Sequence, residues 1–314
     1  MKKKHPSPKL IKKGFHFYLN LTFLGSLLFL ISILPFNNTY ETTELTLRRP
    51  LVQALEVIVP TPAVYPTKLN GYPQPRLTSQ GAIVVDVNSQ KVLFEKNADT
   101  RLYPASTTKV LTALVSLDHY SPSQVLTTFR EKVDGSVLGL HVGEQMKVSD
   151  LLKATLLPSN NDAALVLADN YPGGEKEFVK KMNLKALQLN LTNSHFVNPT
   201  GLHHPNHYST PRDLARLSTV AIKNPALKAV VGTKEATVFN LTTGQTIKIA
   251  NLNELLGTTG VDGVKTGYTE EAGGCLIATK QLGNNRIISV VLNSQDRFLD
   301  TDLLLSFIFN SYRW

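Results

Sequence analysis

Cysteine is almost absent from this chain of 314 residues, since Cys275 is the only one. That excludes an intramolecular disulfide framework and any cysteine-rich metal module. Glycine-rich phosphate loops of the G-x-x-x-x-G-K and G-x-G-x-x-G types are also missing, so no nucleotide cofactor is indicated. Charged residues make up only 18% of the chain and hydrophobic residues 42%, which excludes global disorder and provides for a sizeable core.

Acidic residues are missing from the first 40 positions, although the chain as a whole carries a net charge of +9. Six of its 33 basic residues are lysines within residues 1–13, so the remainder has 27 basic against 24 acidic residues. Most of the excess of basic over acidic residues therefore lies in the N-terminal segment 1–13. It does not indicate a basic surface, and no nucleic-acid partner is expected.

Residues 14–36 contain no Asp, Glu, Lys or Arg and are dominated by Leu, Phe and Ile. Their length matches the roughly 20 residues that a helix needs to cross a membrane, and the preceding lysines orient the N-terminus to the cytoplasm. We expect a basic cytoplasmic tail at 1–13, a transmembrane signal-anchor at 14–36, and an extracytoplasmic domain held at the cell membrane by this single pass. A cleaved signal peptide is the alternative, but the segment is longer than the usual apolar core of about 7–15 residues and lacks a small-residue cleavage site.

Prolines scattered among Thr, Asn and Tyr, without sustained periodicity, predict a semi-extended linker over residues 37–79. Residues 80–314 are then the globular domain. Alternating apolar positions around turn residues predict three β-hairpins, at 81–95, 236–250 and 275–292. Helical periodicity falls at 107–117, 149–157, 163–170, 175–189, 211–221 and 298–309. Strands at both ends and helices between them predict an α+β fold with an antiparallel sheet.

Three short motifs could carry chemistry. In the first, Ser106 and Lys109 have S-x-x-K spacing, which sets a hydroxyl and an ammonium on one face of a helix that is apolar nearly all round. Burial disfavours the charged lysine, and a neutral lysine can take the serine proton. The alternative is a helix-capping serine with a surface lysine.

The second motif, Ser159-Asn160-Asn161, precedes an apolar helix, where serine and asparagine are also ordinary capping residues. The third, Lys265-Thr266-Gly267, suits a strand that binds a carboxylate and lets a ligand approach the backbone, although a turn with a surface lysine is the alternative. The first two motifs are weak evidence on their own and the third is rarer by chance, but the ordered set is specific.

This ordered set resembles the penicillin-binding proteins and serine β-lactamases, and is most similar to the low-molecular-mass D-alanyl-D-alanine carboxypeptidases. The resemblance covers about residues 78–314 and includes the segments 103–106, 198–202, 207–215 and 261–269. It implies an antiparallel sheet flanked by helices with an inserted helical subdomain. It also implies a serine peptidase that removes the terminal D-alanine from peptidoglycan pentapeptides ending in D-Ala-D-Ala, with β-lactams as covalent inhibitors and no metal or other cofactor.

The resemblance also implies roles for individual residues. Ser106 would be the acylated nucleophile, Lys109 its base, and Ser159 a proton relay to the leaving amine beside Lys265. The substrate would be bound by Asn161, Thr266, Gly267, Tyr268 and Arg297. Backbone N–H groups of Ser106 and Tyr268 would form the oxyanion hole. A helix-surface arginine is the alternative for Arg297.

Two rival functions stay open: a serine β-lactamase and a non-catalytic peptidoglycan-binding or β-lactam-sensing protein. The common β-lactamases deacylate with a glutamate in an E-x-x-L-N context, which Glu175 and Glu177 lack. The crowded histidines at 203, 204 and 207 lack an H-E-x-x-H pattern and are expected in a loop. Cys275 is expected to be a buried small hydrophobe.

Overall fold

The computed structural model describes residues 65–69, 71–258 and 260–314. The basic tail, the predicted transmembrane segment and most of the predicted linker lie outside these residues. No helix among the described residues is both long enough and apolar enough to cross a membrane.

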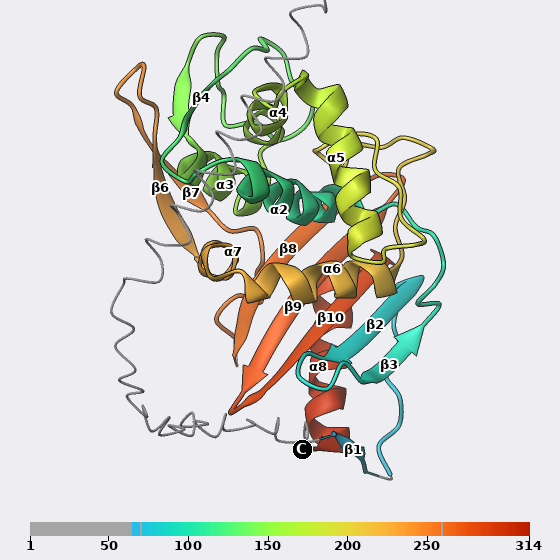
Figure 1. The fold of residues 1–314 in the computed structure, drawn as a ribbon. Coiled ribbons are helices and arrows are strands. Elements are labelled where there is room, and N and C mark those ends of the chain that lie inside the picture. Colours follow the sequence, from blue (N-terminus) through green and yellow to red (C-terminus); the bar gives the residue numbers. More distant parts are fainter. Residues whose placement is uncertain (1–64, 70, 259) are drawn as a thin grey trace, which may run out of the picture. The chain divides into compact units, whose positions relative to one another are not determined.

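A five-stranded antiparallel sheet organises the domain, with strand order β3-β2-β10-β9-β8 (Figure 1). Its strands are β2 (Gly81–Asp86), β3 (Val92–Lys96), β8 (Val261–Thr269), β9 (Gly273–Leu282) and β10 (Asn285–Ser294). The first two strands and the last three are far apart in the sequence and meet where β2 pairs with β10, Ile83 opposite Val290. The predicted antiparallel sheet is therefore confirmed.

Both faces of this sheet are covered, and the side-chain alternation of the strands explains how. Ile83 and Val85 belong to a core with helix α6 (Pro211–Lys223), whereas Ala82 and Val84 belong to a second core with helix α8 (Arg297–Ser311). Because successive side chains point to opposite faces, an all-apolar strand needs a helix on each side. In Figure 1, α6 crosses the front of the sheet and α8 lies behind it.

A helical subdomain is inserted between β3 and β8. It contains a 3-10 turn, η1 (Ala105–Thr108), and helices α2 (Lys109–His119), α3 (Val148–Leu156), α4 (Asn161–Asp169) and α5 (Gly174–Gln188). A hairpin of β4 (Val125–Thr127) and β5 (Gln145–Lys147), helix α7 (Pro225–Val231) and a hairpin of β6 (Glu235–Phe239) and β7 (Thr246–Ala250) complete it. Helix α2 is buried along most of its length, as its apolar composition predicts.

All three predicted hairpins and all six predicted helices are present, with ends shifted by a few residues. The sequence reading missed α7 and the β4–β5 hairpin, because two turns of helix and three-residue strands are too short for a periodicity to show.

The last residues of the predicted linker make defined contacts with the domain. β1 (Thr67–Lys68) pairs with β11 (Tyr312–Arg313) at the C-terminus. The buried carboxylate of Asp300 accepts hydrogen bonds from the backbone N–H groups of Thr78 and Ser79. The chain is therefore anchored before it enters β2.

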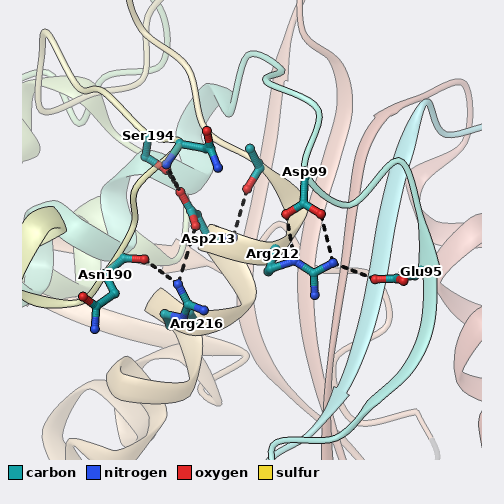
Figure 2. A network of polar contacts seen from close by, with 9 residues as sticks. Glu95, Asp99, Asn190, Ser194, Arg212, Asp213 and Arg216 are labelled. Carbon is teal, nitrogen blue, oxygen red and sulfur yellow. Dashed lines mark hydrogen bonds and ion pairs between the residues drawn. The ribbon is translucent and has the colours of Figure 1, made fainter.

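A polar network at the start of α6 ties the helix to two neighbouring segments (Figure 2). Arg212 makes ion pairs with Asp99 and with Glu95 of β3. Asp213, which is 3% exposed, accepts hydrogen bonds from the backbone N–H of Asn193 and the hydroxyl of Ser194. The network holds α6 on the domain, and none of its residues lines the cleft described below.

Candidate active site

The first motif sits at the turn that opens the helical subdomain. Ser106 lies in η1, directly after Ala105, whose φ of +47° is a left-handed conformation that alanine seldom adopts. Gly201 packs against this turn so closely that a Cβ there would lie 1.9 Å from the Ala105 carbonyl oxygen. The tight turn leaves the Ser106 side chain half-buried and facing a cleft.

Lys109 begins α2 and its side chain is fully buried. Its Nζ donates hydrogen bonds to Asn161 Oδ1 at 2.6 Å and to the Thr200 carbonyl oxygen at 2.8 Å, and lies 2.9 Å from Ser106 Oγ. The two acceptors hold the amine against the serine hydroxyl. The surface-lysine alternative for this motif is therefore wrong.

Burial and like charge set the protonation of the two lysines. Burial lowers the pKa of Lys109 well below its usual value, the nearby Lys265 lowers it further, and Asp162 opposes the shift. Lys265 is 1% exposed, and burial together with the Arg297 guanidinium lowers its pKa to about 7. Lys109 is therefore suited to accept a proton from Ser106.

The second motif supplies two buried side chains from the start of α4. Ser159 has a left-handed φ of +68°, and its Oγ is buried without a hydrogen-bond partner among the described residues. Asn161 accepts from Lys109 through Oδ1 and donates through Nδ2 to the carbonyl oxygen of Asp134 at 2.7 Å. An unpaired buried hydroxyl next to this cleft is a group that a bound ligand could satisfy.

The third motif lies on β8, at the edge of the sheet next to the serine turn. Gly267 approaches that turn, since a Cβ there would lie 3.0 Å from the backbone nitrogen of Ser106. Thr266 is buried, whereas Tyr268, two positions further along the strand and therefore on the same face, is 64% exposed. The turn alternative for this motif is wrong, because all three of its residues are in the strand.

Arg297 opens α8 and reaches the same edge. Its Nη1 donates to the Gly267 carbonyl oxygen at 3.3 Å, while its Nε is buried without a partner among the described residues. The guanidinium also stacks over the ring of Phe298. It is therefore a cleft cation and not a helix-surface arginine.

One cleft of about 190 Å³ brings these side chains together. Its lining includes Ser106, Ser159, Asn161, Thr266, Gly267, Tyr268 and Arg297, with Lys109 and Lys265 buried beneath. The individual roles of these residues stay predictions, but their convergence from η1, α4, β8 and α8 is what those roles require. The arrangement can acylate a serine and hold an anionic group beside it.

Sequence reasoning did not identify several groups at the cleft as functional. The Thr200 carbonyl is aimed at Lys109 by a turn in which Asn198 Oδ1 accepts from the N–H groups of Thr200 and Gly201. Segment 198–202 belongs to the family resemblance, and this resemblance is the signal that could have identified the Thr200 carbonyl. Leu202, in the same segment, also lines the cleft, as do Gly135, Ser136 and Leu252, which no motif in the sequence marks.

The clustered histidines and Cys275, which the sequence analysis also considered, make packing and hydrogen-bond contacts within the domain. His207 is buried, accepts from the backbone N–H of Val197 through Nδ1, and lies 2.8 Å from Thr108 Oγ1 through Nε2. His203 packs edge-on against Tyr103. Cys275 is fully buried in β9, as predicted, and burial raises the pKa of its thiol to about 11.

Comparisons with known proteins agree with this geometry. The sequence model of a family described as D-alanyl-D-alanine carboxypeptidase matches residues 69–296. The chain is 36% identical over 245 residues to D-alanyl-D-alanine carboxypeptidase DacF of Bacillus subtilis, covering 74% of this chain and 63% of that protein. It therefore spans less than two thirds of that relative's length.

Solved structures show the same fold. The Streptomyces K15 DD-transpeptidase is 34% identical with a TM-score of 0.73, covering 76% of this chain and 99% of that one. Penicillin-binding protein D2 of Listeria monocytogenes, solved in an ampicillin-bound form, is 33% identical with a TM-score of 0.68 and the same coverage.

Proposed function

This chain belongs to the D-alanyl-D-alanine carboxypeptidase family, and we propose that it removes the terminal D-alanine from peptidoglycan stem peptides ending in D-Ala-D-Ala, through an acyl-enzyme on Ser106. The observation that carries this proposal is the 2.9 Å contact between Ser106 Oγ and the fully buried Nζ of Lys109. A lysine held uncharged by its surroundings converts an ordinary serine into a nucleophile.

In the acylation step, Ser106 Oγ attacks the carbonyl carbon of the penultimate D-alanine while Lys109 takes the hydroxyl proton. The negative charge develops on the carbonyl oxygen, where preorganised backbone N–H groups of Ser106 and Tyr268 would stabilise it. The peptide C–N bond then breaks, an ester forms on Ser106, and the leaving amine receives a proton through Ser159. The unpaired, buried Ser159 hydroxyl supports this relay.

The substrate's terminal carboxylate is recognised at the β8 edge. Thr266 supplies a hydroxyl there, and Arg297 supplies a guanidinium whose Nε has no partner among the described residues. Asn161 retains one N–H for the substrate amide, because its other N–H is donated to Asp134. Water hydrolyses the ester in the second step, with Lys109 again accepting the proton.

The proposal is tested by D-alanine release from an N-acylated peptide ending in D-Ala-D-Ala, combined with mass spectrometry after incubation with a labelled penicillin. We expect release of D-alanine and a slowly hydrolysed penicillin adduct on the peptide that contains Ser106. The ampicillin-bound form of the Listeria relative supports the use of this probe. Rapid penicillin turnover without D-alanine release would favour the β-lactamase, and penicillin binding with neither reaction would favour the sensor.

Two serine variants sharpen this test. Ser106→Ala should lose both the adduct and D-alanine release. Ser116→Ala is the matched control, because this serine lies on α2, is buried and, among the described residues, its hydroxyl bonds only to the Thr112 carbonyl oxygen of its own helix. Labelling that survives Ser106→Ala would refute the assignment of the nucleophile.

We further propose that residues 14–36 hold the domain at the outer face of the cell membrane. The support is the uncharged stretch of membrane-spanning length after six lysines. Protease added to intact spheroplasts should digest the domain, and the full chain should sediment with membranes. A soluble form beginning near residue 38 would show instead that the segment is cleaved.

A further inference from the structure

A loop without helix or strand, residues 134–140, forms one wall of the cleft. Gly135 and Ser136 line the cleft directly, and most of the loop is exposed to solvent. Such a segment has no ladder of backbone hydrogen bonds of its own, so its conformation depends on contacts from outside it.

Those contacts come from the carboxylate of Asp162, which is 4% exposed. Its Oδ1 accepts from the backbone N–H of Leu138 at 2.9 Å, and its Oδ2 accepts from those of Gly139 at 2.8 Å and Leu140 at 3.1 Å. A carboxylate has acceptor sites on both oxygens, so it can gather three consecutive N–H groups. Neither an amide nor a hydroxyl could replace it there.

The preceding residue binds the other end of the same loop. The Asn161 backbone N–H donates to the Ser136 carbonyl oxygen at 2.7 Å, and its Nδ2 donates to that of Asp134. Because the Asn161 Oδ1 accepts from Lys109, the position of the loop also sets the orientation of the amide that holds the base. Gly135 fits closely, since a Cβ there would lie 2.6 Å from Asn161 Nδ2.

We propose that Asp162 is a positioning residue of this active site: by gathering the N–H groups of residues 138–140 it folds loop 134–140 onto the S-x-N motif, which builds the cleft wall and orients Asn161 toward Lys109. This inference rests on the proposed function and deepens it. Asp162 touches neither Ser106 nor the open cleft, so it acts through the loop and through Asn161.

The charge of Asp162 gives a signature that a purely structural residue would lack. The charged groups that act on Lys109 are Lys265 from β8, which lowers its pKa, and Asp162 from α4, which raises it. Removing the carboxylate charge therefore lowers the pKa of Lys109 further. Since the neutral lysine is the base, acylation of Ser106 should then persist to lower pH than in the wild type.

Asp162→Asn is the direct test, because it keeps the side-chain volume but sets an NH₂ group against backbone N–H donors. We expect kcat/KM for the D-Ala-D-Ala peptide to fall by roughly 10- to 100-fold, the size expected for a misplacement of about 1 Å. In a plot of the penicillin acylation rate against pH, the loss of rate on the acidic side should also move to lower pH.

Asp213→Asn is the matched control. Asp213 is equally buried and also accepts from a backbone N–H and a hydroxyl, but in the network at the start of α6 (Figure 2). This variant should lose stability and keep the wild-type kcat/KM and pH profile. The proposal is overturned if both variants reduce activity only in proportion to their loss of stability, or if the loss of rate on the acidic side does not move in Asp162→Asn.

A glycine pair tests the loop even if Asp162→Asn does not fold. Gly135→Ala and Gly139→Ala place alanine at φ of +83° and +91°, so their backbone strain is similar. A Cβ at 135 would contact Asn161, whereas a Cβ at 139 would have no atom of the described residues within 4 Å. The acylation rate of Gly135→Ala should be well below that of Gly139→Ala, and equal rates in the two variants would count against the proposal. A wild-type chain that releases no D-alanine would instead contradict the proposed function.

Discussion

Gly201 carries no chemistry of its own, yet its replacement by alanine should remove most acylation of Ser106. A Cβ at this position would lie 1.9 Å from the carbonyl oxygen and 2.4 Å from the carbonyl carbon of Ala105. Ordinary contacts of this kind begin near 3.4 Å, so one of the two backbones must move by more than an ångström. The segment that would move is the peptide leading into the nucleophile.

The magnitude follows from two terms. Alanine at the φ of +83° costs about 1–2 kcal/mol, and overpacking adds about 1–3 kcal/mol, so the free energy of unfolding should fall by about 2–5 kcal/mol. For a domain of this size that lowers Tm by roughly 5–20 °C. A shift of about 1 Å in Ser106 should reduce the acylation rate by about 100-fold.

The assay is the rate of Ser106 labelling by a fluorescent penicillin, measured beside thermal unfolding. Gly244→Ala, in the turn between β6 and β7, is the control. Its φ of +72° imposes a similar strain, while its Cβ would have no atom of the part of the chain that the structure describes within 4 Å. It should lose only the strain term and keep the wild-type rate. The reasoning is refuted if Gly201→Ala labels as fast as wild type and melts no lower than Gly244→Ala.

Three further predictions concern charge. Lys109→Arg should lose nearly all acylation of Ser106, because a guanidinium stays protonated and cannot act as a base. In the wild type, the acylation rate should rise with pH through the lowered pKa of Lys109. Near-normal penicillin labelling of Lys109→Arg would show that Lys109 is not the base. Burial lowers the pKa of His207 from 6.5 to about 3, so between these pH values the unfolded chain binds one more proton than the folded chain, and the free energy of unfolding falls by about 1.4 kcal/mol per pH unit as the pH is lowered. Urea unfolding of His207→Gln between pH 3 and 6.5 should therefore show a flatter dependence of the free energy of unfolding on pH, and an unchanged dependence would contradict this. Arg297→Gln should raise the pKa of Lys265 from about 7 toward its usual value, seen as an alkaline shift of the Lys265 titration by NMR, whereas no shift would mean that the guanidinium does not act on this amine.

Local pattern was enough to predict much of this fold and the members of its site. Helix α2 is apolar nearly all round, and this predicted both its burial and the lowered pKa of Lys109. Turn residues and alternation predicted the hairpins, including β9–β10. The ordered motifs indicated Ser106, Ser159 and Lys265, because catalytic chemistry restricts which residue types can stand at those spacings.

Only the tertiary structure decided how those residues meet. The amine of Lys109 is held by Asn161 and by the Thr200 carbonyl, partners that lie in other segments of the chain and whose contacts no local period encodes. The same holds for Arg297, a helix-start residue by sequence, which reaches the cleft because α8 packs behind the sheet. Which side chains converge depends on the packing of whole elements against one another, and this packing is a property of the complete core and not of any segment of the sequence.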